Sequence, residues 1–295
     1  MATDPGGSRE RASRTLGDLQ EVVPLRWTLV APAALLLAFV TLLPILYLGY
    51  LSATDFNVLR GMTEGVVGVQ NYTSAVLESN EFHNALGNTA VFIAVVVTVQ
   101  TVLGFLLALL LWGRPRRRKY VLPVLLTPMF VSWVAVGLMF RFMFEDGIGI
   151  VPLLLSQVGV NISWFSSATY AMIAIMIADI WEWIPFMLIL FLAGLESLPE
   201  EPHEAAVTLP MMFPVIAVAV FIRIVEASKV FPKVLAMTEG GPGSATETGS
   251  WIVYKIGFRF NDLGVAASQA VSLTLMVLGL LYVFYWSGGL QKDVF

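Results

Sequence analysis

Long apolar runs separated by short polar segments fill most of this chain. Six runs of about 20 residues stand out, a length that crosses a hydrocarbon layer of about 30 Å as an α-helix. An open β-sheet would leave its edge groups unsatisfied in lipid, so the spans are predicted to be helical. The pattern therefore predicts an all-α, polytopic transmembrane helical bundle. The predicted spans are residues 27–50, 89–112, 120–144, 169–195, 209–227 and 264–286.

Composition supports a membrane protein and excludes several other classes. Hydrophobic residues make up 57% of the 295 residues and charged residues only 13%, with a mean hydropathy of +0.79. Soluble domains carry about 25% charged residues, so this chain is too apolar for that class. It has no cysteine, which excludes disulfides and thiol chemistry. A net charge of −4 gives no sign of nucleic-acid binding.

Basic residues orient the chain across the membrane. The segment 113–119 reads Gly-Arg-Pro-Arg-Arg-Arg-Lys and carries five of the 17 lysines and arginines. A cytoplasmic N-terminal tail, 1–26, puts this segment, the polar loop 196–208 and the C-terminal tail 287–295 on one side. That side then holds ten of the 17, an asymmetry typical of a cytoplasmic face. We therefore expect both termini inside, in a multi-pass protein of the cell (inner or plasma) membrane.

Three longer segments, 51–88, 145–168 and 228–263, face outside in this topology. They are rich in aromatic residues, glycine, asparagine and aspartate, so we expect ordered loops with short interfacial helices. Residues 240–243 read Gly-Gly-Pro-Gly, which is typical of a tight turn. A phosphate-binding loop would need a lysine after the last glycine, and none follows here.

Catalytic signals are absent from the sequence. The two histidines, His83 and His203, fall in loops on opposite sides of the membrane and cannot form a ligand cluster. The sequence contains no HExxH metal motif, no GxSxG nucleophile elbow and no Walker-type phosphate loop. We therefore expect no enzyme activity, no metal and no cofactor in this chain. If the protein uses ATP, another chain must hydrolyse it.

Ionisable residues inside the predicted spans are the main candidates for a binding site. Each costs a few kcal/mol in lipid unless it faces a partner or a wet cavity. Asp179 and Glu182 lie three apart, on one helical face, with Trp181 between them. Arg223 and Glu226 have the same spacing in the fifth span. These residues could line a solute pathway, where carboxylates bind hydroxyl groups and an aromatic face packs on an apolar ring.

A structural role for the same residues is the alternative. Glu182 could pair with Arg223 and bridge two helices, or Arg223 could pair with Glu226 within one helix. Both arrangements satisfy the charges without a solute. The sequence leaves the two roles open.

From residue 192, the sequence LAGLESLPEEPHEAA resembles the cytoplasmic loop of binding-protein-dependent ABC importer permeases of the maltose and sugar type. In that family a leucine-rich helix end and an IPxEL stretch lead to Glu-Ala-Ala, then to a glycine and to LPxxxP. Other family motifs occur in the expected order, and together they are specific. The matches are residues 69–72, 85–89, 181 with 185–186, 198–201, 204–206, 209–210 with 214, 238–243, 246–248 and 254–258.

The resemblance implies a permease domain over residues 27–286. Such permeases have about six spans, work as a pair of like subunits and open alternately to either side of the membrane. The second permease subunit is expected to be a different chain. The solute is expected to be a sugar or polyol, delivered by an extracytoplasmic solute-binding protein.

The resemblance also implies two contact sites. The loop containing Glu-Ala-Ala docks into a cleft of a cytoplasmic ABC ATPase dimer, which hydrolyses the ATP. The residues expected in this contact are Glu200, Glu201, Glu204, Ala205 and Ala206. The external glycine-proline loop meets the solute-binding protein. The residues expected there are Gly240, Gly241, Pro242 and Gly243.

The docking loop departs from the family in one respect. Only Val207 and Thr208 separate Glu-Ala-Ala from Leu-Pro, whereas the family has a glycine and most of a second docking helix there. Because a helix rises 1.5 Å per residue, the loss removes more than two helical turns. The alternative function is therefore a coupling-deficient assembly or receptor-like membrane subunit.

Overall fold

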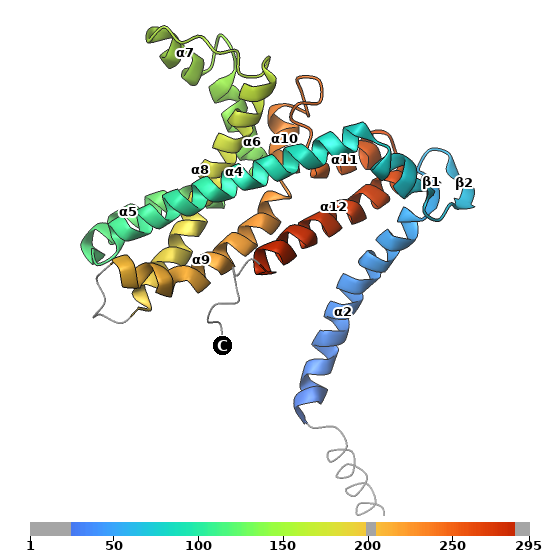
Figure 1. Cartoon of the computed structure of the whole chain (residues 1–295), viewed down its shortest axis with the longest axis horizontal. Helices are drawn as coiled ribbons and strands as arrows, with labels where there is room; N and C mark the ends of the chain where they lie inside the picture. The colour runs from blue at the N-terminus through green and yellow to red at the C-terminus, as the bar shows by residue number, and fades with distance from the viewer. Residues whose placement is uncertain (1–24, 199–204, 287–295) are drawn as a thin grey trace, which may run out of the picture. The chain divides into compact units, whose positions relative to one another are not determined.

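The computed structural model of the chain describes residues 25–198 and 205–286 (Figure 1). The chain divides into two compact units, residues 1–50 and 51–295, which are described separately. In the first unit, α2 (Leu25–Ser52) is one helix that ends just past the unit boundary. It is apolar on all sides, and its side chains from Val30 to Tyr50 are mostly exposed. Such a helix suits lipid rather than water, in agreement with the first predicted span.

The second unit consists of helices and a small hairpin (Figure 1). The hairpin pairs β1 (Thr54–Asn57) with β2 (Gly61–Val66) in antiparallel orientation. The long helices are α4 (Asn80–Leu111), α8 (Ala168–Glu196), α9 (Ala205–Ala227) and α12 (Leu263–Phe284). The shorter elements are α3 (Gln70–Tyr72), η1 (Thr73–Leu77), α5 (Pro115–Leu126), η2 (Thr127–Phe130), α6 (Trp133–Phe144), α7 (Ile150–Gln157), α10 (Phe231–Met237), α11 (Gly249–Tyr254) and η3 (Lys255–Arg259).

The third predicted span is broken in the structure. Within residues 25–198 and 205–286, five helices are long and apolar enough to cross a membrane. A sixth span is a bent pair, Pro115–Phe130 and Trp133–Phe144, whose axes differ by 97°. Pro128 removes a backbone donor where α5 gives way to the short helix η2, just before the break, and this favours a break over a continuous helix. The run 120–144 is therefore two helical pieces rather than the single helix that its hydropathy predicted.

α4 begins at Asn80 rather than at residue 89, where its apolar run starts. Ser79 caps the helix, because its side chain accepts a hydrogen bond from the backbone nitrogen of Phe82 at 3.2 Å. Glu81 lies in the first turn, where a carboxylate is favourable to the helix dipole. Hydropathy thus located the part of α4 suited to lipid, while the cap determines where the helix begins.

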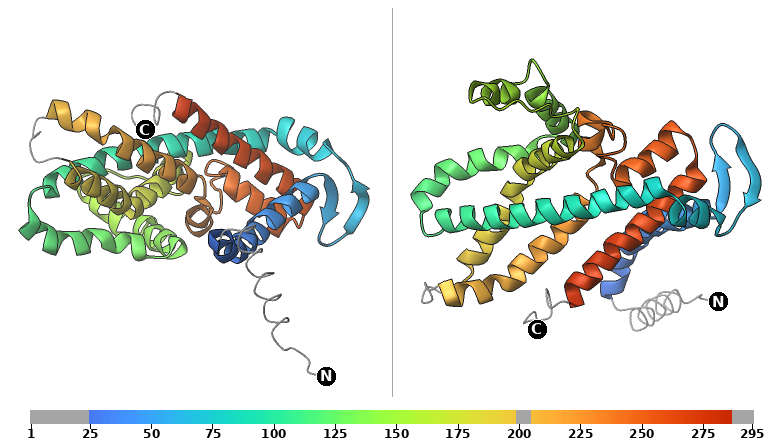
Figure 2. Two further views of the ribbon diagram at one scale, coloured as in Figure 1. Left: turned by 90° about the horizontal axis from the view of Figure 1, so that it is seen from below. Right: turned by 45° about the horizontal axis from the view of Figure 1, so that its top comes forward.

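The segments predicted to be external are ordered and contain short helices, as expected, together with the hairpin, which was not predicted. Figure 2 shows the hairpin at the end of the bundle where α4 begins. Nδ2 of Asn71 holds the start of the hairpin by donating to the backbone oxygens of Ser52 and Thr54, at 3.1 and 2.9 Å. A Cβ atom at Gly264 would lie 2.2 Å from the oxygen of Thr54, so α12 can start here only with glycine.

α8 is the central helix of the unit and packs against α4, α6 and α9. A Cβ atom on Gly104 of α4 would lie 2.5 Å from Cβ of Met187 on α8. A Cβ atom on Gly194 of α8 would lie 2.9 Å from Cε of Met212 on α9. These small residues let the helices approach closely, which is the usual basis of helix packing in membranes. The close approach brings polar side chains from α4, α8 and α9 together.

Candidate functional site

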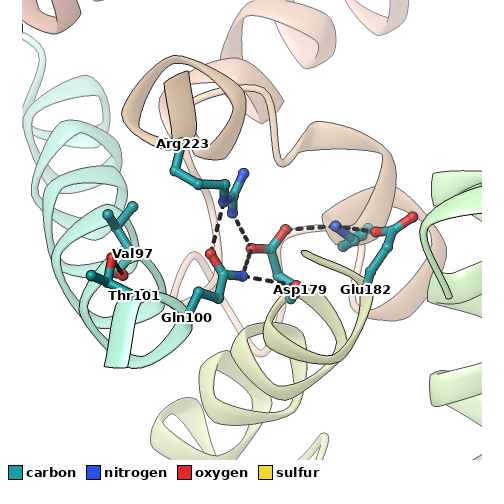
Figure 3. Close-up of polar contacts among 7 residues, drawn as sticks. Val97, Gln100, Thr101, Asp179, Glu182 and Arg223 are labelled. Carbon is teal, nitrogen blue, oxygen red and sulfur yellow. Dashed lines mark hydrogen bonds and ion pairs between the residues drawn. The ribbon is translucent and has the colours of Figure 1, made fainter. Parts of the chain in front are cut away.

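Charged side chains are buried where α4, α8 and α9 meet (Figure 3). Nη2 of Arg223 on α9 donates to Oδ2 of Asp179 on α8 at 2.6 Å. Gln100 on α4 binds both residues. Its Nε2 donates to Oδ2 of Asp179 at 3.0 Å, and its Oε1 accepts from Nε of Arg223 at 2.7 Å. None of the three is more than 2% exposed, so each charge is compensated by a partner in place of water.

Lys233 on α10 completes this group. Its Nζ lies 2.6 Å from Oδ1 of Asp179 and 2.6 Å from Oε2 of Glu182. Two cations thus face two carboxylates, and we call Gln100, Asp179, Glu182, Arg223 and Lys233 the buried charge cluster. Within the described part of the chain, Oε1 of Glu182 and Nη1 of Arg223 are buried without a hydrogen-bond partner, while Oε2 of Glu182 faces the Lys233 ammonium. The cluster is neutral as a whole but retains unused hydrogen-bonding capacity.

A small hollow lies beside the buried charge cluster. Its volume is about 10 Å³, room for about one water molecule and too little for a sugar. The ring of Trp183 lies beside it, with its centroid 4.6 Å from Cζ of Arg223, in the range of a cation–π contact. The lining residues are Trp133, Asp179, Trp183, Glu226, Lys229, Val230, Pro232 and Lys233. A larger solute could enter at this depth only if the surrounding helices separated.

The structure brings together three of the five residues that the sequence placed on a solute path: Asp179, Glu182 and Arg223. Glu226 lies beside them on the hollow and pairs with Lys229 at 2.7 Å. Trp181 points elsewhere, since its ring packs on that of Phe140 with centroids 5.5 Å apart. The ion pairs also differ from those predicted for a structural role. Arg223 bridges two helices by pairing with Asp179 rather than with Glu182. Glu226 pairs with Lys229 rather than with Arg223. A role for any of these residues in solute passage stays a prediction.

Sequence reasoning missed three residues of this region. Trp183, rather than Trp181, lies beside the cluster, and its spacing of four from Asp179 was the available signal. Gln100 was also visible as an amide in the middle of an otherwise apolar run. Lys233 falls within the segment 228–263, which the sequence predicts to be external, but it is only 3% exposed. It could not be found by hydropathy, because α10 returns it to the bundle after the chain has left the fifth span.

The Gly-Pro loop, residues 238–248, which the sequence predicts to be external, is held by side chains from α4. Nδ2 of Asn88 donates to the backbone oxygens of Ala245 and Glu247, at 3.2 and 2.9 Å. Oγ1 of Thr89 accepts from the backbone nitrogen of Gly249 at 2.8 Å, where α11 begins. The family-like motif at 85–89 therefore has a structural role in fixing this loop.

The four residues of the Gly-Pro turn differ in exposure. Gly240 is buried, Gly241 and Pro242 are half-buried, and Gly243 is exposed. Gly240 has φ +90°, and a Cβ atom there would lie 2.6 Å from Nε1 of Trp251, so glycine is required on both counts. Gly243 therefore offers the most accessible surface to a partner. The predicted contact of this turn with a solute-binding protein stays a prediction.

Lys255 in η3 joins the Gly-Pro loop to the start of α4. Its Nζ lies 2.6 Å from Oε1 of Glu247 and also pairs with Glu81. Burial lowers the pKa of the Lys255 ammonium, but hydrogen bonds to Glu247 and Glu81 outweigh this and raise the pKa above its ordinary value of 10.5. The two ion pairs thus favour the charged lysine in the folded protein.

The raised pKa of Lys255 predicts a pH-dependent contribution to stability. Stabilisation by the charged group is complete below the ordinary pKa and is lost as the pH rises through the higher, folded value. The melting temperature of Lys255→Met should therefore lie below that of the wild type by a constant amount from about pH 7 to about pH 9. The difference should shrink at about pH 11. Arg259→Met is the control, since its guanidinium pairs with Glu239 and does not titrate in this range.

The predicted ATPase-docking loop is only partly visible. α8 ends at Glu196, which forms an ion pair with Arg118 of α5. Glu200, Glu201 and Glu204 lie outside the described residues. Ala205 and Ala206 form the first turn of α9, which continues without a break to Ala227. No separate second docking helix therefore lies between Ala206 and the fifth span, as the shortened sequence predicted.

Comparison with known proteins identifies the family. A probable ABC transporter permease protein, y4oQ, of Sinorhizobium fredii is 31% identical over 273 residues, covering 86% of this chain and 87% of that protein. The trehalose/maltose transport system permease protein MalF of Thermococcus litoralis is also 31% identical, covering 77% of this chain and 81% of the relative. The chain belongs to the ABC transporter permeases. No family model matches it.

The fold of the permease also matches solved structures. A chain of a bacterial ABC transporter involved in the import of the acidic polysaccharide alginate superposes with a TM-score of 0.76. The superposition covers 95% of the permease and 99% of that chain, although only 18% of residues are identical. The likeness confirms the predicted all-α, polytopic fold.

Proposed function

We propose that the permease forms the solute pathway of an ABC importer for sugars or polyols. A second permease subunit, expected to be a different chain, forms the other half of the pathway. A cytoplasmic ABC ATPase dimer hydrolyses the ATP, so this chain needs no cofactor and performs no catalysis. An extracytoplasmic solute-binding protein delivers the solute, and the complex lies in the inner or plasma membrane.

The names of the relatives support a polyhydroxylated solute. The Thermococcus litoralis relative belongs to a trehalose/maltose transport system, and a relative of Agrobacterium fabrum to one for sulfoquinovosyl glycerol. A relative from Yersinia enterocolitica, 27% identical, belongs to a transport system for sn-glycerol-3-phosphate. These cargoes each carry two or more hydroxyl groups but differ in charge and size.

The buried charge cluster is the structural observation that carries the proposal. Asp179 lies eleven residues into α8, a rise of about 16 Å along the helix axis, so it falls well inside this predicted span. Ionisable side chains at the bilayer centre are costly and commonly mark a solute pathway. Asp179, Glu182 and Trp183 offer the hydroxyl acceptors and aromatic face that a sugar needs once the helices separate.

Reconstitution of the whole complex tests this function. The permease is purified with its ATPase, its second permease subunit and its binding protein, and placed in liposomes with ATP inside. We expect maltose or trehalose, together with the binding protein, to raise ATP hydrolysis several-fold and to accumulate in the vesicles. An ATPase variant that binds but does not hydrolyse ATP is the control. Failure of the permease to associate with any ABC ATPase would contradict the proposed function.

The same assay tests the shortened docking loop. A second version of the permease carries a full-length family loop, with its glycine and second docking helix, between Ala206 and Leu209. Equal hydrolysis and uptake by both versions would show that the missing helix is dispensable. Higher hydrolysis by the longer version would show that the natural loop limits coupling.

A further inference from the structure

The start of α5 carries a dense group of positive charges. Arg118 is half-exposed, and the other members are exposed. The group, which we call the α5 basic patch, comprises Arg114, Arg116, Arg117, Arg118 and Lys119. In the parts of the chain that the structure describes, one member of the patch, Arg118, forms an ion pair with a carboxylate, that of Glu196. The patch also lies at the N-terminus of α5, the positive end of the helix dipole. Cations are unfavourable there, and a bound anion is favourable.

An apolar groove continues from the α5 basic patch along the same helix. It is open and has a volume of about 350 Å³. Its lining residues are Pro115, Arg118, Lys119, Leu122, Pro123 and Leu126. They recur at intervals of three and four, so they share one face of α5. The groove is therefore cationic at the expected cytoplasmic end and apolar toward the interior of the membrane.

The length of the groove corresponds to one leaflet of a bilayer. From Arg116 to Leu126 the helix rises about 15 Å, half of a hydrocarbon layer of about 30 Å. The helical stretch then ends at Phe130, next to the break in the span. A lipid of the cytoplasmic leaflet has the same order of groups over the same distance, from a polar headgroup to an acyl chain.

We propose that this groove binds one anionic phospholipid of the cytoplasmic leaflet. Lys119 and Arg118 at the cationic end of the groove bind the phosphate, Arg116 and Arg117 in the same turn add positive charge around it, and an acyl chain lies along Leu122 and Leu126. Arginine and lysine bind phosphate by charge-assisted hydrogen bonds, and basic segments next to spans are attracted to anionic lipid. An acidic protein surface could pair with the charges, but it would leave the apolar part of the groove uncovered. The continuity of charge and apolar surface therefore favours a lipid.

The test compares two variants with the same change in charge. Wild type, R116Q/R117Q/K119Q and R9Q/R11Q/R14Q are reconstituted in phosphatidylcholine vesicles that contain phosphatidylglycerol. After extraction in mild detergent, bound phosphatidylglycerol is counted by native mass spectrometry. Arg118 is kept because it pairs with Glu196. We expect wild type and the N-terminal variant to retain one phosphatidylglycerol. The α5 variant should bind it at least tenfold more weakly, because each cation contributes about fivefold to the affinity for anionic lipid.

Further measurements separate the alternatives. R116K/R117K preserves the charge and should retain the lipid, and similar melting temperatures would show that all variants fold. Inorganic phosphate should not displace the lipid, since it cannot occupy the apolar groove. Unchanged lipid binding in the α5 variant, equal loss in both glutamine variants, or displacement by phosphate would each overturn the proposal. Loss of ATPase association with the lipid retained would assign the patch to a protein partner instead.

Discussion

Arg223→Met should destabilise the permease by about 3–5 kcal/mol, the usual cost of removing one partner from a buried ion pair. Arg223 is fully buried and donates to both Asp179 and Gln100. Without the guanidinium, Lys233 alone must compensate the carboxylates of Asp179 and Glu182. Unfolding in detergent, followed by circular dichroism, measures the loss.

Two comparisons make the Arg223 prediction specific. Arg259→Met removes an arginine from the exposed pair with Glu239 and should cost less than about 1 kcal/mol. The double variant Asp179→Asn/Arg223→Met removes one charge of each sign and should recover part of the lost stability, because no uncompensated carboxylate is created. A loss for Arg223→Met as small as that for Arg259→Met would show that the buried charge cluster does not stabilise the bundle.

Gly104→Ala and Gly87→Ala should change stability in opposite directions, although both lie in α4. A Cβ atom at Gly104 would meet Cβ of Met187 at 2.5 Å and the backbone nitrogen of Leu188 at 3.2 Å. The backbone cannot yield as a flexible side chain does, so α4 and α8 must separate, at a cost of about 1–3 kcal/mol. At Gly87 no atom lies within 4 Å of the added methyl group, and alanine should stabilise the helix by about 0.5–1 kcal/mol.

Thermal unfolding of both glycine variants in the same detergent tests this pair. Gly87→Ala is the matched control, because it introduces the same methyl group into the same helix. Equal melting temperatures for the two variants would contradict close packing of α4 on α8. The prediction concerns folding alone, so it can be tested without the partner subunits.

The six spans could be predicted because lipid imposes one requirement on every residue that it contacts. Hydropathy therefore located α8 almost to its ends, with residues 169–195 predicted and Ala168–Glu196 observed. Hydropathy failed for residues whose structure does not depend on contact with lipid. The polar first turns of α4 depend on the cap at Ser79, and the break before Trp133 depends on backbone donors that proline lacks.

The candidate site was predictable only in part, because charge pairing depends on which helices meet. Periodicity placed Asp179 and Glu182 on one face of α8 and identified Arg223 as a possible partner. It could not identify Lys233, whose approach depends on the course of the chain after α9. The docking residues Glu200, Glu201 and Glu204 were found only through resemblance to the family, and their role stays a prediction.

α10 connects the Gly-Pro loop to the buried charge cluster at the centre of the permease. Its seven residues carry Lys233 near one end and lead at the other into the Gly-Pro loop at Thr238. α10 is held along its side by α6, where Gly137 leaves room for Ala236 and Arg141 donates to the backbone oxygen of Met237. A rigid helix of this length cannot absorb a displacement internally. If α10 followed a displacement of the loop as a rigid body, the Lys233 ammonium would move by a similar distance and leave carboxylates that now lie 2.6 Å away.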